Sequence, residues 1–358
     1  MSKIAPRQLY FFFACIAPLG KLVLLPTQLA QYSANDLLFP AAINFLLQAG
    51  VIFLIMLLSR SNSTFFDLLI NTFGKITAKI LICIFSLFLI FVSFLPILEQ
   101  KLFIQSVFYD TLPSTVAFST FFLFSAYICA KPAGVLGRTW DILAPLAVFG
   151  IVGILVFSVA NADFAALAPV GVTGAKSIFQ STLYTVSWFY DSAMLLMLMG
   201  RFDYQKGMAW KSALFYLLGA AVILLYLAIF FGIYEGIAVR QIFSFAKIGK
   251  YNSGVPVLGR IDYLFIFALT LGLSFYCTMP LHLGVTCLVQ AFGGGKYRPA
   301  LFSVGANLII FILTILMTYH FTTVNKTVNE TLCYLFLVFC VLIPAFALLL
   351  RRKPREKV

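Results

Sequence analysis

The stretch Ala17-Pro18-Leu19-Gly20-Lys21 interrupts the first long hydrophobic segment of the chain, near residues 9–30. A second stretch, Ser187-Trp188-Phe189-Tyr190-Asp191, interrupts a later segment near residues 181–200. Both stretches place polar or helix-breaking residues where a membrane helix is expected to be most apolar. Unwound backbone is tolerated in a membrane only where it lines a cavity or packs against protein. Two broken helices at matching positions therefore predict a binding site of the transporter type.

The composition predicts a polytopic integral membrane protein. The chain has 358 residues, of which 62% are hydrophobic and 10% charged, whereas a soluble domain is about half apolar and about a quarter charged. We expect one membrane domain over residues 1–358, and the first apolar run is interpreted as an uncleaved span. The net charge of +13 is explained by positive residues on the inner side of the membrane, so nucleic acid is not expected as a partner.

With about 20 apolar residues needed for each span, the hydropathy pattern predicts an all-α fold of about ten transmembrane helices. Lysine and arginine gather in every second connection, which predicts that both termini are cytoplasmic and that the protein is integral to the bacterial cytoplasmic membrane. The predicted spans are 9–30, 37–58, 78–107, 115–130, 142–160, 181–200, 212–234, 262–290, 299–320 and 331–350.

The two halves of the pattern, 9–160 and 181–350, hold five predicted helices each. An odd number of helices in a repeat forces the second repeat to be inverted relative to the first. Helix one then corresponds to helix six, and these are the two interrupted helices. The pattern predicts the five-plus-five inverted repeat of LeuT-like transporters, with helices 1 and 6 broken.

Three segments are expected to lie at the membrane surface. Residues 63–74 and 174–181 are amphipathic and shorter than a span, on the inner and outer side respectively. A short helix is expected within the outer stretch 235–261. The basic run 351–355 predicts contact with membrane lipid.

Four charged residues lie well inside predicted spans, where a charge is costly unless it is paired or hydrated. Lys21 is a candidate to bind a substrate carboxylate or to stand where a coupling cation would bind, or it forms a structural ion pair with Glu99 or Asp191. Glu99 is a candidate to bind a substrate ammonium or to carry a proton. Asp191 ends the aromatic cluster of the second interruption. Lys101 is interpreted as reaching the outer surface.

The candidate substrate-binding set comprises Pro18, Leu19, Gly20, Lys21, Glu99, Ser187, Trp188, Tyr190 and Asp191. Glu99 and His282 are also candidates for a proton relay, although a single histidine held by a local backbone partner is the alternative. The chain has seven cysteines without a CxxC motif and two histidines. This pattern contains no metal-ligand cluster, so no metal and no cofactor are expected. The sequence also shows no pair of a nucleophile and a general base, so no enzymatic activity is expected.

Several stretches resemble the B subunit of bacterial spore germinant receptors, the GerAB group of the amino acid–polyamine–organocation superfamily. They are Ile4-Ala5-Pro6-Arg7-Gln8-Leu9 before Leu24-Leu25-Pro26; Phe65-Phe66-Asp67-Leu68-Leu69 with Phe73-Gly74-Lys75 and Lys79-Ile80-Leu81; Leu112-Pro113-Ser114-Thr115 with Tyr127, Gly134 and Arg138; and Asp163, Leu167 and Pro169. In the family, the first helix breaks at a glycine-x-glycine stretch. Here Leu19 and Lys21 stand at those glycine positions.

The resemblance implies a receptor subunit that recognises a small nutrient, such as an amino acid, between helices one, three, six and eight. Its implied partners are the A and C subunits of the receptor, and its implied location is the inner membrane of the spore. Nutrient binding would signal by a conformational change. The alternative is a proton-coupled amino-acid permease of the same superfamily, because sensing and transport use the same architecture.

Overall fold

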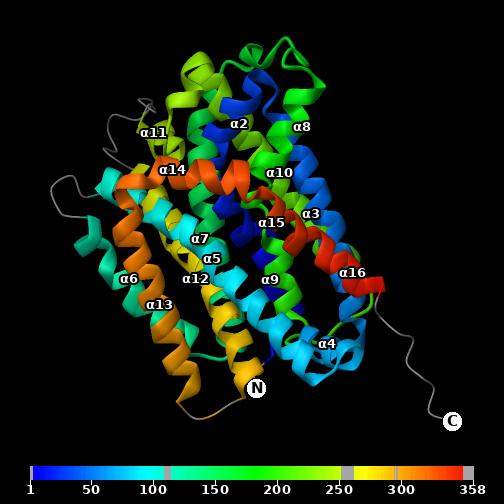
Figure 1. Cartoon of the computed structure of the whole chain (residues 1–358). Helices are drawn as coiled ribbons and strands as arrows, with labels where there is room; N and C mark the ends of the chain where they lie inside the picture. Colours follow the sequence, from blue (N-terminus) through cyan, green and yellow to red (C-terminus); the bar gives the residue numbers. More distant parts are fainter. Residues whose placement is uncertain (1–2, 109–113, 251–261, 294, 296, 350–358) are drawn as a thin grey trace.

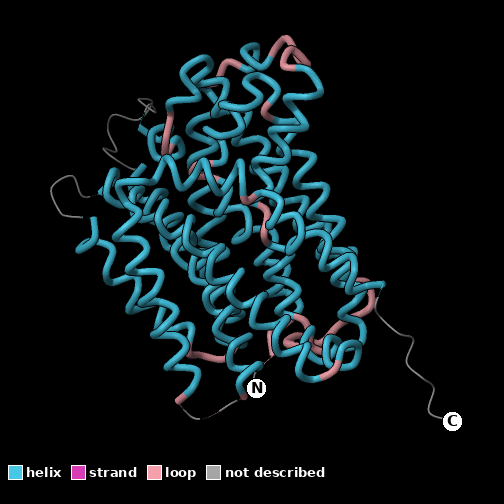
Figure 2. The backbone as a smooth tube through the Cα atoms, in the orientation of Figure 1, coloured by secondary structure: helices cyan, strands magenta, loops and turns pink. Residues whose placement is uncertain are grey.

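The computed structural model describes residues 3–108, 114–250, 262–293, 295 and 297–349. Throughout this part of the chain the fold is a bundle of helices without a β-strand (Figure 1, Figure 2). The α-helices are α1 (Pro6–Phe11), α2 (Leu25–Ser33), α3 (Leu38–Leu58), α4 (Phe65–Phe73), α5 (Lys75–Phe108), α6 (Ser114–Cys129), α7 (Ala133–Ser158), α8 (Gly174–Thr185), α9 (Asp191–Leu198), α10 (Met208–Tyr234), α11 (Ser244–Lys250), α12 (Asp262–Phe292), α13 (Arg298–Met317), α14 (Phe321–Lys326), α15 (Cys333–Leu337) and α16 (Ile343–Leu349).

Each of the ten predicted spans coincides with helical structure. Among the described residues, six helices are long and apolar enough to cross a membrane, and a seventh span results if the bent pair Pro6–Lys21 and Leu25–Asp36 counts as one. Two shorter apolar helices cover Phe118–Cys129 and Cys333–Leu349. The protein is therefore an integral membrane protein, while the count of ten and the division into repeats at 9–160 and 181–350 remain predictions.

The first predicted interruption is present in the structure. After α1 the helix continues as a π-helical turn, η1 (Phe12–Ile16), and a 3₁₀ turn, η2 (Ala17–Lys21). The axis then bends by 61° before α2 begins at Leu25. Proline removes a backbone donor and glycine costs helix stability, so Pro18 and Gly20 account for the loss of regular helix here.

The second predicted interruption is present as well. The helix α8 passes into a 3₁₀ turn, η7 (Val186–Trp188), and regular helix resumes only at Asp191 with α9. One prediction was wrong: residues 174–181 are not a separate surface helix but the first part of α8. The reason is lateral packing, since Asn44 of α3 donates to the Thr182 carbonyl at 3.0 Å and to Thr185 Oγ1 at 3.1 Å.

Helices are present in two other segments that were predicted to lie at the membrane surface. The predicted inner segment is α4, whose N-cap Thr64 accepts from the Asp67 N–H at 3.1 Å while the Asp67 carboxylate accepts from the Thr64 N–H at 3.1 Å. This reciprocal pair is a capping box. The stretch 235–250 contains the turn η8 (Glu235–Arg240) and α11, whereas 251–261 and the basic run 351–355 lie outside the described residues.

The first broken helix lies at the centre of the bundle because its neighbours carry glycines where it approaches them. A Cβ at Gly219 of α10 would lie 2.6 Å from Cγ of Pro18, and a Cβ at Gly272 of α12 would lie 2.6 Å from Cδ1 of Leu19. At Gly219 the same Cβ would also lie 2.9 Å from the backbone oxygen of Ala14, so a side chain there would require the backbone to move. In Figure 1, α14, α15 and α16 follow one another obliquely across the front of this centre.

Candidate functional site

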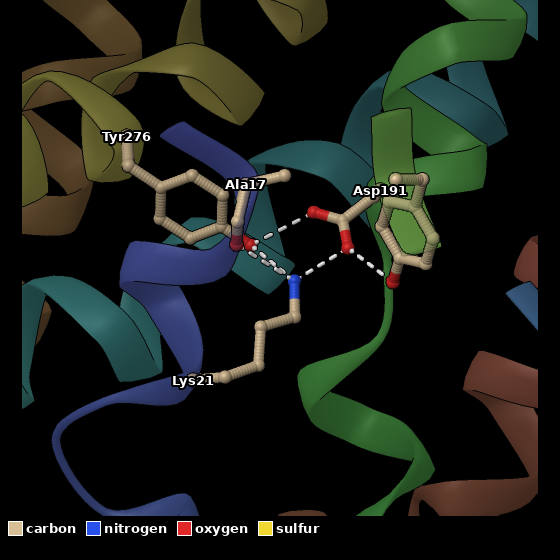
Figure 3. Close-up of polar contacts among 5 residues, drawn as sticks. Ala17, Lys21, Asp191 and Tyr276 are labelled. Atoms are coloured by element: carbon tan, nitrogen blue, oxygen red, sulfur yellow. Dashed lines mark hydrogen bonds and ion pairs between the residues drawn. The ribbon is translucent and has the colours of Figure 1, made fainter. Parts of the chain in front are cut away.

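The two interruptions are joined by an ion pair. Lys21, at the end of η2, and Asp191, the first residue of α9, are both 0% exposed, and the Lys21 ammonium contacts the Asp191 carboxylate (Figure 3). Nζ of Lys21 also donates to the Ala17 carbonyl at 3.0 Å. Two charges taken out of water need each other and further hydrogen bonds, because desolvation is expensive. The pair is thus the electrostatic centre of the bundle.

Two tyrosines complete the coordination of the Asp191 carboxylate. Tyr216 of α10 donates its hydroxyl to Oδ2 at 3.1 Å, and Tyr276 of α12 donates to Oδ1 at 3.2 Å. The Tyr276 hydroxyl also lies 3.4 Å from the Lys21 ammonium (Figure 3). Both carboxylate oxygens are therefore hydrogen-bonded, and four separate elements, η2, α9, α10 and α12, meet at one charged cluster.

Aromatic rings enclose the ammonium. Nζ of Lys21 lies 5.6 Å from the ring centroid of Phe189 and 5.4 Å from that of Tyr276, within the range of cation–π attraction. Phe45 packs edge-on against Phe189 at 4.9 Å between centroids, and Tyr190 packs against Tyr276 at 5.8 Å. These rings exclude water from the ion pair.

Gly20 is required by this packing. A Cβ at Gly20 would lie 2.2 Å from Cε1 of Tyr276, closer than real Cβ contacts allow. The glycine lets the Tyr276 ring lie directly on the backbone of the first break, where its hydroxyl reaches both charges.

A network of amides lies beside the second interruption. Trp188 donates its indole N–H to Gln28 of α2 at 2.6 Å, and Gln28 donates to Asn325 of α14 at 2.8 Å. Ser187 donates to the side chain of Asn329, which in turn donates to Asn325 at 2.9 Å. The network links α2, η7 and the segment that begins with α14.

Glu99 of α5 is close to the same centre but differently surrounded. It is 3% exposed, and its carboxyl lies near the backbone N–H of Leu24, in the bend of the first helix. Within the described part of the chain its Oε1 has no hydrogen-bond partner. A buried carboxyl oxygen without a partner is costly, so this position is suited to a proton or a bound ligand group.

The other two singled-out residues lie in separate surroundings. His282 of α12 is buried, and its Nε2 lies 2.8 Å from the carbonyl of Lys131. No hydrogen bond among the described residues joins it to Glu99, so the relay stays a prediction. Lys101 was wrongly predicted to reach the surface: it is buried and donates to Thr318 at 2.8 Å and Thr115 at 3.2 Å. These hydroxyls replace water around its ammonium.

The structure brings together most of the predicted set. Lys21 and Asp191 meet directly, Gly20 and Tyr190 pack against Tyr276, and Ser187 and Trp188 join the amide network. Pro18 and Leu19 are buried against α10 and α12. Sequence reasoning missed Tyr216, Tyr276, Gln28, Asn325 and Asn329. The available signal was that tyrosine, glutamine and asparagine inside apolar segments need hydrogen-bond partners.

Two broken helices joined at a buried polar centre are typical of a membrane protein with a transporter fold. One solved structure with this fold is a manganese transporter from Eremococcus coleocola, in complex with an aromatic bis-isothiourea substituted compound. It matches with a TM-score of 0.54 at 13% identity, over 96% of this chain and 78% of that chain. The fold is therefore that of LeuT-like transporters. Among the described residues, no three His, Cys, Asp or Glu side chains gather as metal ligands.

The family follows from the sequence. A family model described as spore germination protein matches residues 41–322, and the chain belongs to this family. The expected family is thereby confirmed. None of the curated protein sequences compared with the chain matches it.

Proposed function

We propose that this protein is the nutrient-recognising membrane subunit of a spore germinant receptor. The observation that carries the proposal is the buried Lys21–Asp191 pair, which joins the two broken helices at the centre of a transporter fold. Together with membership of the spore germination protein family, it supports recognition of a small nutrient between η2, α5, α9 and α12. Tyr216, which donates to Asp191, adds α10 to the helices that we expected to surround the site.

A ligand shifts a conformational equilibrium only by its different affinity for the two states. In the proposed receptor, the two bends supply the moving parts: α1 and α2 can change their 61° angle, and α8 and α9 can change theirs at Phe189 and Tyr190. Nutrient contacts at the centre would favour one angle, and partner subunits would read it. We propose the A and C subunits as these partners, in the inner membrane of the spore, with both termini of this chain cytoplasmic.

The direct test uses spores of the source organism that lack this gene. Single amino acids, sugars and nucleosides are supplied separately, and germination is followed as the loss of refractility. Loss of the response to one nutrient, restored by the wild-type gene, would support the receptor role. Normal germination with every nutrient would contradict it.

One observation favours a second candidate, a proton-coupled permease. The Glu99 carboxyl is buried beside the bend at Leu24 and has an oxygen without a partner, as a residue that binds and releases a proton during transport would. Uptake of labelled amino acids by growing cells separates the two candidates. Lost uptake with normal germination in the deletion strain would favour the permease, and unchanged uptake with lost germination would favour the receptor.

A further inference from the structure

The surroundings of the Lys21 ammonium have the chemistry of a ligand-binding cage. A carboxylate, a backbone carbonyl at a helix break and a tyrosine hydroxyl contact Nζ, and two aromatic rings lie within 5.6 Å of it. Proteins recognise free ammonium ligands with this combination of charge-assisted hydrogen bonds and aromatic faces. In this chain, the cation is the protein's own side chain.

We infer that the cage formed by Ala17, Phe189, Asp191 and Tyr276 is an ammonium-binding site that Lys21 fills from within. The nutrient of the proposed receptor is then recognised through groups other than an ammonium. The first part concerns the geometry of this chain alone, and only the second part rests on the proposed function.

The Lys21 ammonium already occupies the position in the cage that a second ammonium would need. Of the two Asp191 oxygens, Oδ2 accepts from Lys21 and Tyr216, and Oδ1 accepts from Tyr276. Lys21 is 0% exposed and is tethered at the rim of the cage, so its effective concentration there exceeds that of a free ligand supplied at millimolar levels. Binding of a free ammonium would also displace Lys21 and leave its charge buried and unpaired, which is unfavourable.

The nearby carboxyl of Glu99 does not share this role. It contacts the Leu24 N–H and has no described contact with Lys21. Of the two buried carboxyls near the breaks, only Asp191 lies within the aromatic rings that mark the cage. Removing the Lys21 side chain should therefore open a site for one small primary alkylammonium ion, paired with Asp191.

The experiment compares the purified full-length protein with Lys21→Ala in detergent, each with and without ethylammonium chloride. Tetramethylammonium chloride serves at the same ionic strength as a cation that cannot donate hydrogen bonds. We expect ethylammonium to raise the thermal unfolding midpoint of Lys21→Ala by about 2–4 °C once the site is saturated, and not that of the wild type. Lys211→Ala, which removes an exposed lysine of α10, is the matched control and should not respond.

Equal responses of Lys21→Ala and the wild type, or no response of Lys21→Ala, would overturn the inference. If Lys21→Ala fails to accumulate, its amount in membranes is measured from cells grown with and without ethylammonium. Recovery by ethylammonium, and not by tetramethylammonium, would support the cage, whereas no recovery would overturn it. These readouts do not involve germination, so failure of the cage and failure of the receptor role are separate results.

Discussion

Two buried carboxyls lie near the broken helices, and their surroundings are opposite. Asp191 has hydrogen-bond donors at both oxygens, from Lys21, Tyr216 and Tyr276. Glu99 lies near the Leu24 N–H and has an oxygen with no described partner. The difference teaches that one centre contains two kinds of polar position. The paired carboxylate of Asp191 fixes the arrangement of the two breaks. The incompletely paired carboxyl of Glu99 is suited to bind a proton or a ligand group.

The largest effect is expected from breaking the paired position. Asp191→Ala leaves the Lys21 ammonium buried without a counter-charge, which should lower the free energy of unfolding by about 3–5 kcal/mol. The measurement is thermal or denaturant unfolding in detergent. The matched control is Asp203→Ala, at the exposed pair with Lys3 whose side chains are 64% and 53% exposed, where the loss should stay below about 1 kcal/mol. Equal losses in the two variants would contradict the account.

A smaller effect is expected when only the packing of the pair is disturbed. Gly20→Ala places a Cβ 2.2 Å from the Tyr276 ring and pushes its hydroxyl away from both charges, at a cost of about 1–3 kcal/mol. Gly50→Ala on α3, where a Cβ meets no atom within 4 Å, should be neutral or stabilising by up to about 1 kcal/mol. The unfolding free energies of the two variants are compared. A loss at Gly20 without a loss at Gly50 would show that the close contact with Tyr276, and not the loss of a glycine as such, lowers stability.

The amide network beside the second break should matter less than the ion pair. Gln28→Ala leaves the Trp188 N–H and Asn325 with one partner fewer each, which should cost about 1–2 kcal/mol. The control Gln180→Ala removes an exposed amide that contacts Tyr184 and should change stability by less than about 0.5 kcal/mol. A neutral Gln28→Ala variant would mean that the network does not stabilise the contact between α2 and η7.

The smallest effect on stability is expected at the incompletely paired position. Glu99→Gln keeps the shape of the side chain and an oxygen near the Leu24 N–H, so the free energy of unfolding should change by no more than about 1 kcal/mol. The nutrient response, or uptake if the protein is a permease, should nevertheless be weakened, because the ionisable group is gone. Glu235→Gln, at an exposed turn, is the control. Strong destabilisation with an intact response would reverse the roles assigned to Glu99 and Asp191.

The broken helices could be predicted from the sequence because their causes are local. Pro18 removes a backbone donor and Gly20 weakens the helix. Lys21 and Asp191 are charged residues within otherwise apolar segments, so they also mark the interruptions. Hydropathy likewise predicted ten spans that all coincide with helical structure, although it did not predict α14. Hydropathy did not predict the length of α8. Thr182 and Thr185 pack laterally against Asn44 of another helix, and the hydropathy of a single segment carries no information on such a contact.

The partners of the buried charges could not be predicted because they come from distant parts of the chain. Sequence reasoning left open whether Lys21 pairs with Glu99 or with Asp191, and the distance between helices decides this in favour of Asp191. Tyr276 is 255 residues from Lys21, and nothing local marks it or Tyr216 as a ligand of the carboxylate. Lys101 was misjudged for the same reason, since Thr318 comes from another helix.

The most direct test of the central claim is the nutrient concentration needed for germination in spores that carry Asp191→Asn. Spores with Asp203→Asn serve as the control, and equal amounts of both variants in the spore membrane are verified first. If the centre between the broken helices is the recognition site, Asp191→Asn should raise the half-maximal concentration by about tenfold or more, because Lys21 loses the counter-charge that holds the two breaks in place around the nutrient. An unchanged concentration dependence at equal protein amounts would contradict the account.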